Sequence, residues 1–250
     1  MTSPDGELNE RRRVELEKSL REVRERIDAA CRAAGRRPDD VGLLAVTKTF
    51  PAGDAALLSD LGLTEFAENR EQEARAKVAE FGALRPHANV RWHMVGQLQR
   101  NKARSVARWA DVVESVDSPR LAEALQRASA RALESGERQE PLDVLIQVNL
   151  DGQSGRGGCS PENVPRLAEM ISRMYEIRLR GVMAVAPLEG DPDVSFDTLL
   201  RISERMRQDF PDADQVSAGM SGDLESAIAH GSTRVRVGTG LLGGRPLVSP

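Results

Sequence analysis

The chain has 250 residues, of which 40% are hydrophobic and 3% aromatic, and its formal net charge is −4. These values are typical of a globular protein with an aliphatic core, and they give no overall basic attraction to nucleic acid. No apolar run reaches the ~18 residues that a membrane helix needs, and the N-terminus lacks the apolar centre of a secretory signal.

The first expected element is a long charged helix over residues 6–34, in which apolar residues recur near helical spacing before Gly35. Short apolar strands and amphipathic helices then alternate. Eight strands are expected, at 41–47, 65–67, 90–93, 112–116, 142–148, 179–183, 215–218 and 234–237. Helices are expected between them, at 52–61, 69–82, 97–107, 118–135, 161–174, 194–209 and 221–229.

This alternation predicts parallel strands, because a helix is the usual crossover between them. Eight such units favour a single (β/α)8 TIM barrel of the α/β class with an extra N-terminal helix, and a doubly wound open sheet is the alternative. We expect one domain over residues 1–250. It comprises a helix over 1–35 that packs on the barrel, the barrel itself over 40–240, and a tail over 241–250.

Lys48 stands at the end of the first apolar strand, in LLAVTKTFP. The C-terminal ends of the strands form the active face of such barrels, so polar residues there are informative. A strand-end lysine commonly reaches solvent. In a barrel mouth it can instead be held in a pocket, with a lowered pKa and an amine able to attack a carbonyl.

Two glycine-rich loops follow the last two expected strands, SAGMSGD at 217–223 and VGTGLLGG at 237–244. Loops in these positions often bind phosphate through backbone N–H groups. Ser217, Ser221, Gly238 and Thr239 would supply the hydroxyls and the close backbone approach. Ser221 has another possible role, because it can cap the helix expected near it.

Arg236 lies on the last expected strand, on the same side as Arg234. An arginine inside a barrel needs an acceptor, since an unpaired buried charge is costly. Arg236 therefore forms either a structural salt bridge or a donor to a ligand atom.

A strand-end lysine, a phosphate loop pair and an arginine on the last strand together suggest pyridoxal 5′-phosphate (PLP). Over residues 40–246 the chain resembles the pyridoxal phosphate homeostasis proteins, the YggS or PROSC family. The blocks that carry the resemblance are AVTKTFP (45–51), FAENREQE (66–73), RWHMVGQLQRNKA (91–103), VLIQVNLDGQSGRGG (144–158), LRGVMAVAP (179–187) and VSAGMSGDLESAIAHGSTRVRVGTGLLGGR (216–245).

The resemblance implies the barrel half of the alanine racemase fold, without its second β-domain. It implies that Lys48 holds the cofactor as an internal aldimine and that Arg236 donates to the pyridine nitrogen. The phosphate-binding positions that it matches are Ser217, Gly238 and Thr239, with Ser221 and the backbone of Met220 as neighbours. Those around the ring are Asn69, Met94 and Met183. No metal site is expected.

Two segments depart from the family pattern. Arg70 follows Asn69 where the family commonly has tyrosine, which alters the mouth. The segment 153–158 reads QSGRGG where the family commonly has a lysine in a K-S-G pattern, so any role of that lysine does not transfer to Arg156.

Three functions are compatible with these residues. The first is a non-catalytic carrier that buffers PLP on Lys48 and releases it to apo-enzymes. The second is a PLP-dependent amino-acid racemase, which needs a second acid–base group; His93 at the mouth is the best candidate, although a structural role for it is favoured. Tyr175 is expected to lie away from the mouth. The third is a nucleic-acid or protein-binding module that uses the basic run at 97–104, which is more often a solvated face.

Carrier function is the favoured interpretation, because the chain lacks the domain that supplies the second catalytic group of a racemase. Cys31 and Cys159 form neither a disulfide framework nor a metal cluster, which favours a reducing cytoplasm. We expect a monomer whose partners are PLP and PLP-dependent apo-enzymes, and neither nucleic acid nor a membrane.

Overall fold

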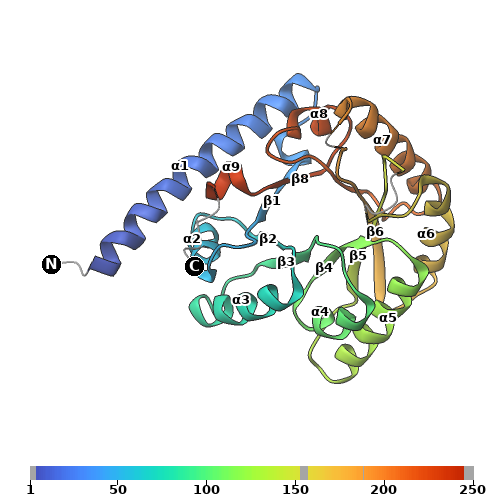
Figure 1. The fold of residues 1–250 in the computed structure, drawn as a ribbon, viewed down its shortest axis with the longest axis horizontal. Helices are drawn as coiled ribbons and strands as arrows, with labels where there is room; N and C mark the ends of the chain where they lie inside the picture. Colours follow the sequence, from blue (N-terminus) through green and yellow to red (C-terminus); the bar gives the residue numbers. More distant parts are fainter. Residues whose placement is uncertain (1–3, 153–156, 188, 245–250) are drawn as a thin grey trace.

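The computed structural model describes residues 4–152, 157–187 and 189–244. Eight parallel strands form a closed barrel in chain order, and β8 pairs back onto β1 (Figure 1). The predicted (β/α)8 barrel is therefore confirmed, and the open-sheet alternative is wrong. Closure leaves no strand edge unpaired and brings every strand's C-terminal end to one mouth.

The strands of the barrel wall have the following bounds. They are β1 (Gly42–Val46), β2 (Glu65–Glu68), β3 (Arg91–Met94), β4 (Val112–Val116), β5 (Leu142–Gln147), β6 (Ile177–Met183), β7 (Gln215–Ser217) and β8 (Arg234–Val237). The helices are α1 (Pro4–Ala33), α2 (Ala52–Asp60), α3 (Glu71–Leu84), α4 (Ala103–Trp109), α5 (Pro119–Glu134), α6 (Val164–Ser172), α7 (Pro192–Asp209), α8 (Leu224–Ala229) and α9 (Thr239–Leu242).

The elements at the mouth differ from expectation in three places. The helix expected at 97–107 begins as a 3₁₀ turn at Arg100–Lys102, and α4 starts only at Ala103. Helix α8 begins at Leu224, with Asp223 rather than Ser221 at its N-cap position. Helix α9 was not expected, and it occupies the start of the predicted tail, where Leu241 and Leu242 are buried.

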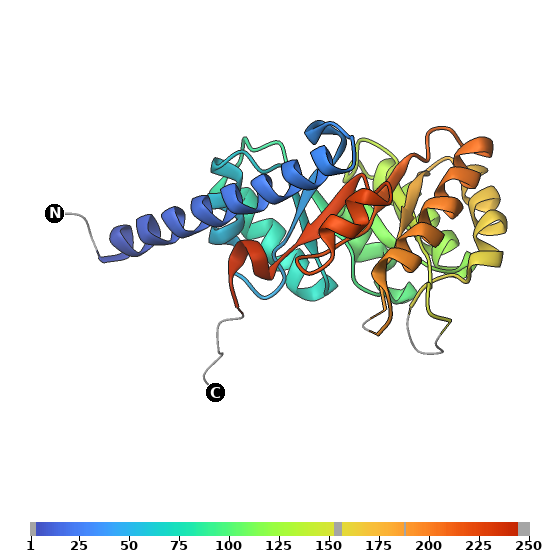
Figure 2. The same cartoon turned by 90° about the horizontal axis from the view of Figure 1, so that it is seen from above.

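Helix α1 runs along the outside of the barrel and extends past it at its N-terminal end (Figure 2). It packs against α8, α9 and α2. Its buried stripe recurs every three or four residues, which is one face of a helix, and consists of Leu16, Leu20, Val23, Ile27, Ala30 and Cys31. Helix α1 therefore covers one side of the outer helix ring through this stripe.

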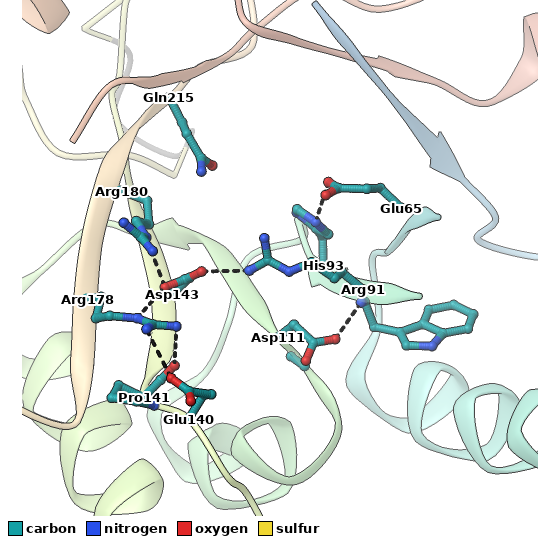
Figure 3. Close-up of polar contacts among 12 residues, drawn as sticks. Glu65, Arg91, His93, Asp111, Glu140, Pro141, Asp143, Arg178, Arg180 and Gln215 are labelled. Atoms are coloured by element: carbon teal, nitrogen blue, oxygen red, sulfur yellow. Dashed lines mark hydrogen bonds and ion pairs between the residues drawn. The ribbon is translucent and has the colours of Figure 1, made fainter. Parts of the chain in front are cut away.

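The base of the barrel, opposite the mouth, is closed by ion pairs (Figure 3). The Asp143 carboxylate receives Arg91 at 2.6 Å, Arg178 at 2.8 Å and Arg180 at 3.1 Å. Three strands are thereby tied to one buried charge. Such base contacts serve stability, whereas the chemistry of these barrels sits at the other end.

Across the described ranges, every helix is too short or too polar to cross a bilayer. The same residues contain no cluster of three or more potential metal ligands.

Candidate cofactor site at the barrel mouth

Lys48 lies two residues beyond β1, at the mouth, and its side chain is half-buried. Among the described residues it has no hydrogen bond or ion pair. The next residue, Thr49, has a φ of 70°, a left-handed conformation that costs energy in a residue with a β-branched side chain. The chain therefore turns sharply around an amine that has no partner among residues 4–152, 157–187 and 189–244.

The backbone before Lys48 is fixed by a buried polar group of three side chains. The Lys77 amine donates to the Thr47 carbonyl at 2.6 Å and to Glu68 at 2.5 Å. The Thr47 hydroxyl donates to the same Glu68 oxygen at 2.6 Å. Because these groups are buried and bonded to one another, they hold the end of β1, although Oε2 of Glu68 has no hydrogen-bond partner among the described residues.

The loops after β7 and β8 meet beside this strand end. The Gly240 N–H donates to the Ser221 hydroxyl at 3.3 Å. A Cβ at Gly240 would lie 3.3 Å from that hydroxyl, and a Cβ at Gly238 would lie 3.3 Å from the Val46 carbonyl. The narrow space at both positions suits glycine. The backbone N–H of Thr239, which lies between them in the chain, makes no hydrogen bond with the described residues. These groups form a small cradle of hydroxyls and N–H groups close to Lys48, which suits an anionic oxygen.

Ser221 does not cap α8, so the alternative role considered for it is wrong. The cap position belongs to Asp223, whose carboxylate accepts the Met220 N–H at 2.6 Å. The Ser221 hydroxyl remains half-exposed in the cradle.

Arg236 is 5% exposed and lies inside the barrel on β8. Its Nη1 donates to the Ser217 carbonyl at 2.6 Å and to the Ser217 hydroxyl at 2.8 Å, and its Nη2 donates to the Ala184 carbonyl at 2.6 Å. Its Nε–H has no hydrogen-bond partner in the described part of the chain. Burial lowers the pKa of Arg236 against the pull of Glu114. The simple salt bridge considered for Arg236 is absent among these residues, and two of its five N–H groups, on Nε and Nη2, are left for a ligand.

Ser217 is fully buried, and its hydroxyl is used inside the barrel. It donates to Glu114 at 2.6 Å and accepts from Arg236. A phosphate contact for Ser217 stays a prediction, and it competes with this arrangement.

The residues expected around a ring fall into two groups. Asn69 and Met94 line a pocket of about 590 Å³ at the ends of β2 and β3, together with Gln97 and Lys102. A Cβ at Gly96 would come within 2.0 Å of the Asn69 carbonyl, so glycine lets these two loops touch. Met183 lies elsewhere, in an interior cluster with Val112 and Leu145.

His93 does not lie exposed at the mouth, contrary to the expectation for a catalytic acid. It is completely buried between Glu114, 2.7 Å from Nδ1, and Glu65, 2.9 Å from Nε2. Tyr175 is 87% exposed just before β6, at the base end of that strand. Neither side chain is placed to move a proton at Lys48.

Sequence reasoning missed Glu114 and the Glu68–Lys77 pair. The signal for Glu114 was a lone carboxylate within the apolar strand VVESV, where a charge needs a specific partner. The departure at Arg70 gives an exposed ion pair with Glu73. Residues 153–156, including Arg156, lie outside the described residues.

This fold and site define a class. The chain matches the model of the alanine racemase N-terminal domain family over residues 19–246. Alanine racemase from Corynebacterium glutamicum has a TM-score of 0.65 at 14% identity over 91% of this chain and 62% of that chain, which shows a shared fold alone.

Relatives of higher sequence identity define the family more narrowly. The chain is 48% identical over 248 residues to the pyridoxal phosphate homeostasis protein of Mycobacterium tuberculosis, with 96% of both chains covered. It is 32% identical to PipY of Synechococcus elongatus, solved with PLP bound, with a TM-score of 0.74 over 91% of this chain and 100% of that one. The chain belongs to the pyridoxal phosphate homeostasis protein family, as its sequence blocks predicted.

Proposed function

We propose that this chain binds pyridoxal 5′-phosphate at the barrel mouth and acts in PLP homeostasis as a carrier or buffer without turnover of its own. The observation that carries the proposal is the Lys48 amine, which no described residue pairs with, beside the cradle formed by Ser221, Thr239 and Gly240. PipY, which shares the fold and a third of the sequence, has been solved with PLP bound.

Each side chain has a role in this proposal. PLP would supply an aldehyde that can condense reversibly with an amine, with loss of water, and Lys48 would supply that amine. Ser221, Gly238, Thr239 and the Met220 backbone hold the phosphate. Arg236 donates to the ring nitrogen, which keeps that nitrogen unprotonated because a second cation is unfavourable there. Asn69, Met94 and Met183 surround the ring. Ser217 acts through the two hydrogen bonds that it accepts from Arg236.

The test is PLP uptake by purified protein, wild type beside Lys48→Ala. We expect wild type to acquire a visible absorption band that borohydride fixes onto the peptide containing Lys48. Lys48→Ala should lose this covalent product. Lys18→Ala, at an exposed lysine of α1, is the matched control and should behave as wild type. A wild-type protein that takes up no PLP would refute the proposal.

Carrier function has its own test. Loaded protein, mixed with a PLP-dependent apo-enzyme, should restore that enzyme's activity and lose its own band. Incubation with D- or L-alanine should give no interconversion, because His93 and Tyr175 lie away from the site; interconversion would support a racemase instead. We further propose a cytoplasmic location, which suits the two free, buried cysteines.

A further inference from the structure

Glu114 places a carboxylate in the middle of the barrel, where its side chain is fully buried. Its Oε2 accepts the Ser217 hydroxyl at 2.6 Å, and its Oε1 lies 2.7 Å from Nδ1 of His93. Because β7 is not a neighbour of β4, the bond to Ser217 crosses the barrel interior. A buried carboxylate stays ionised only where cations and donors replace its lost water.

His93 supplies that compensation. Both ring nitrogens face carboxylate oxygens, Glu114 on one side and Glu65 on the other (Figure 3 shows the contact with Glu65). A neutral imidazole has one N–H, so its bare nitrogen would face a carboxylate lone pair. The imidazolium instead donates to Glu114 and places its charge 2.9 Å from Glu65, although this second contact lacks hydrogen-bond geometry. Complete burial opposes this charge, but the contacts with Glu114 and Glu65 raise the pKa of His93.

The remaining charges around His93 and Glu114 come from β8 and β3. Arg234 approaches Glu65 at 2.9 Å and Glu114 at 3.9 Å. Arg91 also acts on Glu65, and Arg236 acts on Glu114. Charges of opposite sign therefore alternate across the interior in the order Arg236, Glu114, His93, Glu65 and Arg234, with the Ser217 hydroxyl between the first two.

The Ser217 hydroxyl makes Arg236 depend on Glu114. It has one proton, which goes to the Glu114 carboxylate, and its oxygen is then free to accept from Arg236. All the direct acceptors of Arg236 are neutral oxygens of Ser217 and Ala184. The ionised carboxylate thus fixes the direction of the hydroxyl, and the hydroxyl fixes one edge of the guanidinium.

We propose that Glu114, held ionised by His93, is a positioning residue that acts through Ser217 to orient Arg236 toward the ring nitrogen of the bound cofactor. This inference rests on the proposed function. It gives the buried histidine a role in ligand binding, as part of the support behind Arg236, without contact with the ligand.

The test compares PLP with its deaza analogue, in which a C–H replaces the ring nitrogen. Binding of each is measured for wild type, Glu114→Gln and the control Glu134→Gln, an exposed carboxyl at the end of α5. Glu114→Gln keeps the size of the side chain and removes its charge. We expect it to weaken PLP about tenfold and the analogue less than about twofold, because only PLP uses the Arg236 donor. The control should match wild type for both.

A second variant keeps the inference testable if Glu114→Gln does not fold. Ser217→Ala removes the hydroxyl link but keeps the backbone carbonyl that Arg236 also uses. We expect the same loss, selective for PLP over the analogue. Imidazole NMR of the ligand-free proteins gives a separate measurement: His93 should keep its second ring proton to a higher pH in wild type and Ser217→Ala than in Glu114→Gln.

The outcomes separate the two proposals. Equal weakening of both ligands means a purely structural role and overturns the inference. Unchanged PLP binding in both variants also overturns it, as does a wild-type His93 that loses its second ring proton at or below the ordinary pKa of 6.5. Failure of wild type to bind either ligand refutes the proposed function itself, and the inference with it.

Discussion

Two lysines lie near the end of β1, and their surroundings give them opposite properties. Lys77 is buried and paired with Glu68 and the Thr47 carbonyl, so its charge is committed to structure. Lys48 is half-buried and has no partner in the described chain. An amine without a counterion is the one available for a ligand, and the paired lysine holds it in place.

Replacing Lys77 with methionine should leave the Glu68 carboxylate buried without its cation. We expect a loss of about 3–5 kcal/mol in the free energy of unfolding, measured by urea denaturation. Lys18→Met, which breaks an exposed pair with Glu22, is the control and should change stability by less than about 0.5 kcal/mol. A Lys77→Met protein as stable as wild type would show that the buried pair contributes nothing.

The ionisation of Glu114 should make the stability of the protein depend on pH. Burial opposes its charge, but His93 and the nearby arginines lower its pKa from 4.5 to about 2. A lowered folded-state pKa means that the contribution is present above pH 4.5 and is lost as the pH falls toward 2. The gap in unfolding free energy between wild type and Glu114→Gln should therefore shrink over this interval. A constant gap would contradict the assigned charge.

At the scale of elements, α1 joins the outer helix ring to the cofactor loops. Its Arg26 donates to the Ser221 carbonyl at 3.1 Å and pairs with Glu225 of α8. Its Arg12 pairs with Asp54 of α2 and donates to the Leu242 carbonyl of α9. The helix thus holds the outer side of the same loops whose inner side forms the cradle.

The cradle loop should tolerate a methyl group poorly where it faces Ser221. Gly240→Ala places a Cβ 3.3 Å from the Ser221 hydroxyl and from a Val237 methyl, so the loop must shift. We expect a several-fold loss of PLP affinity with less than about 1 kcal/mol of stability lost. The control is Gly53→Ala in α2, where nothing lies within 4 Å of the added Cβ. Equal PLP affinity in both variants would argue against phosphate at this loop.

For the whole molecule, barrel closure predicts a single cooperative unit. Each strand depends on two neighbours, and the pairing of β8 with β1 links the two ends of the chain. We expect coincident urea transitions for secondary structure and for tryptophan fluorescence, and a concentration-independent mass near 27.3 kDa, as for a monomer. Separate transitions would indicate two domains, and a mass that rises with concentration would indicate self-association.

Local patterns predicted much of the architecture. Alternating apolar runs and amphipathic stretches gave all eight strands within about two residues, because a buried strand requires a run of apolar residues whatever it pairs with. The positions of Lys48 and of the glycine-rich loops followed from the strand ends. Helix α9 escaped prediction because four residues carry too little periodicity, and its helical form depends on burial of Leu241 and Leu242.

The sequence by itself determined the barrel and the family, since these depend on the order of residues along the chain and on the alternation of strands and helices. The tertiary structure alone decided which charges meet inside the barrel. His93, Glu114 and Ser217 come from β3, β4 and β7, and no local pattern relates them. Low-dielectric burial forces such groups to find partners, but which partners they find depends on how the barrel closes.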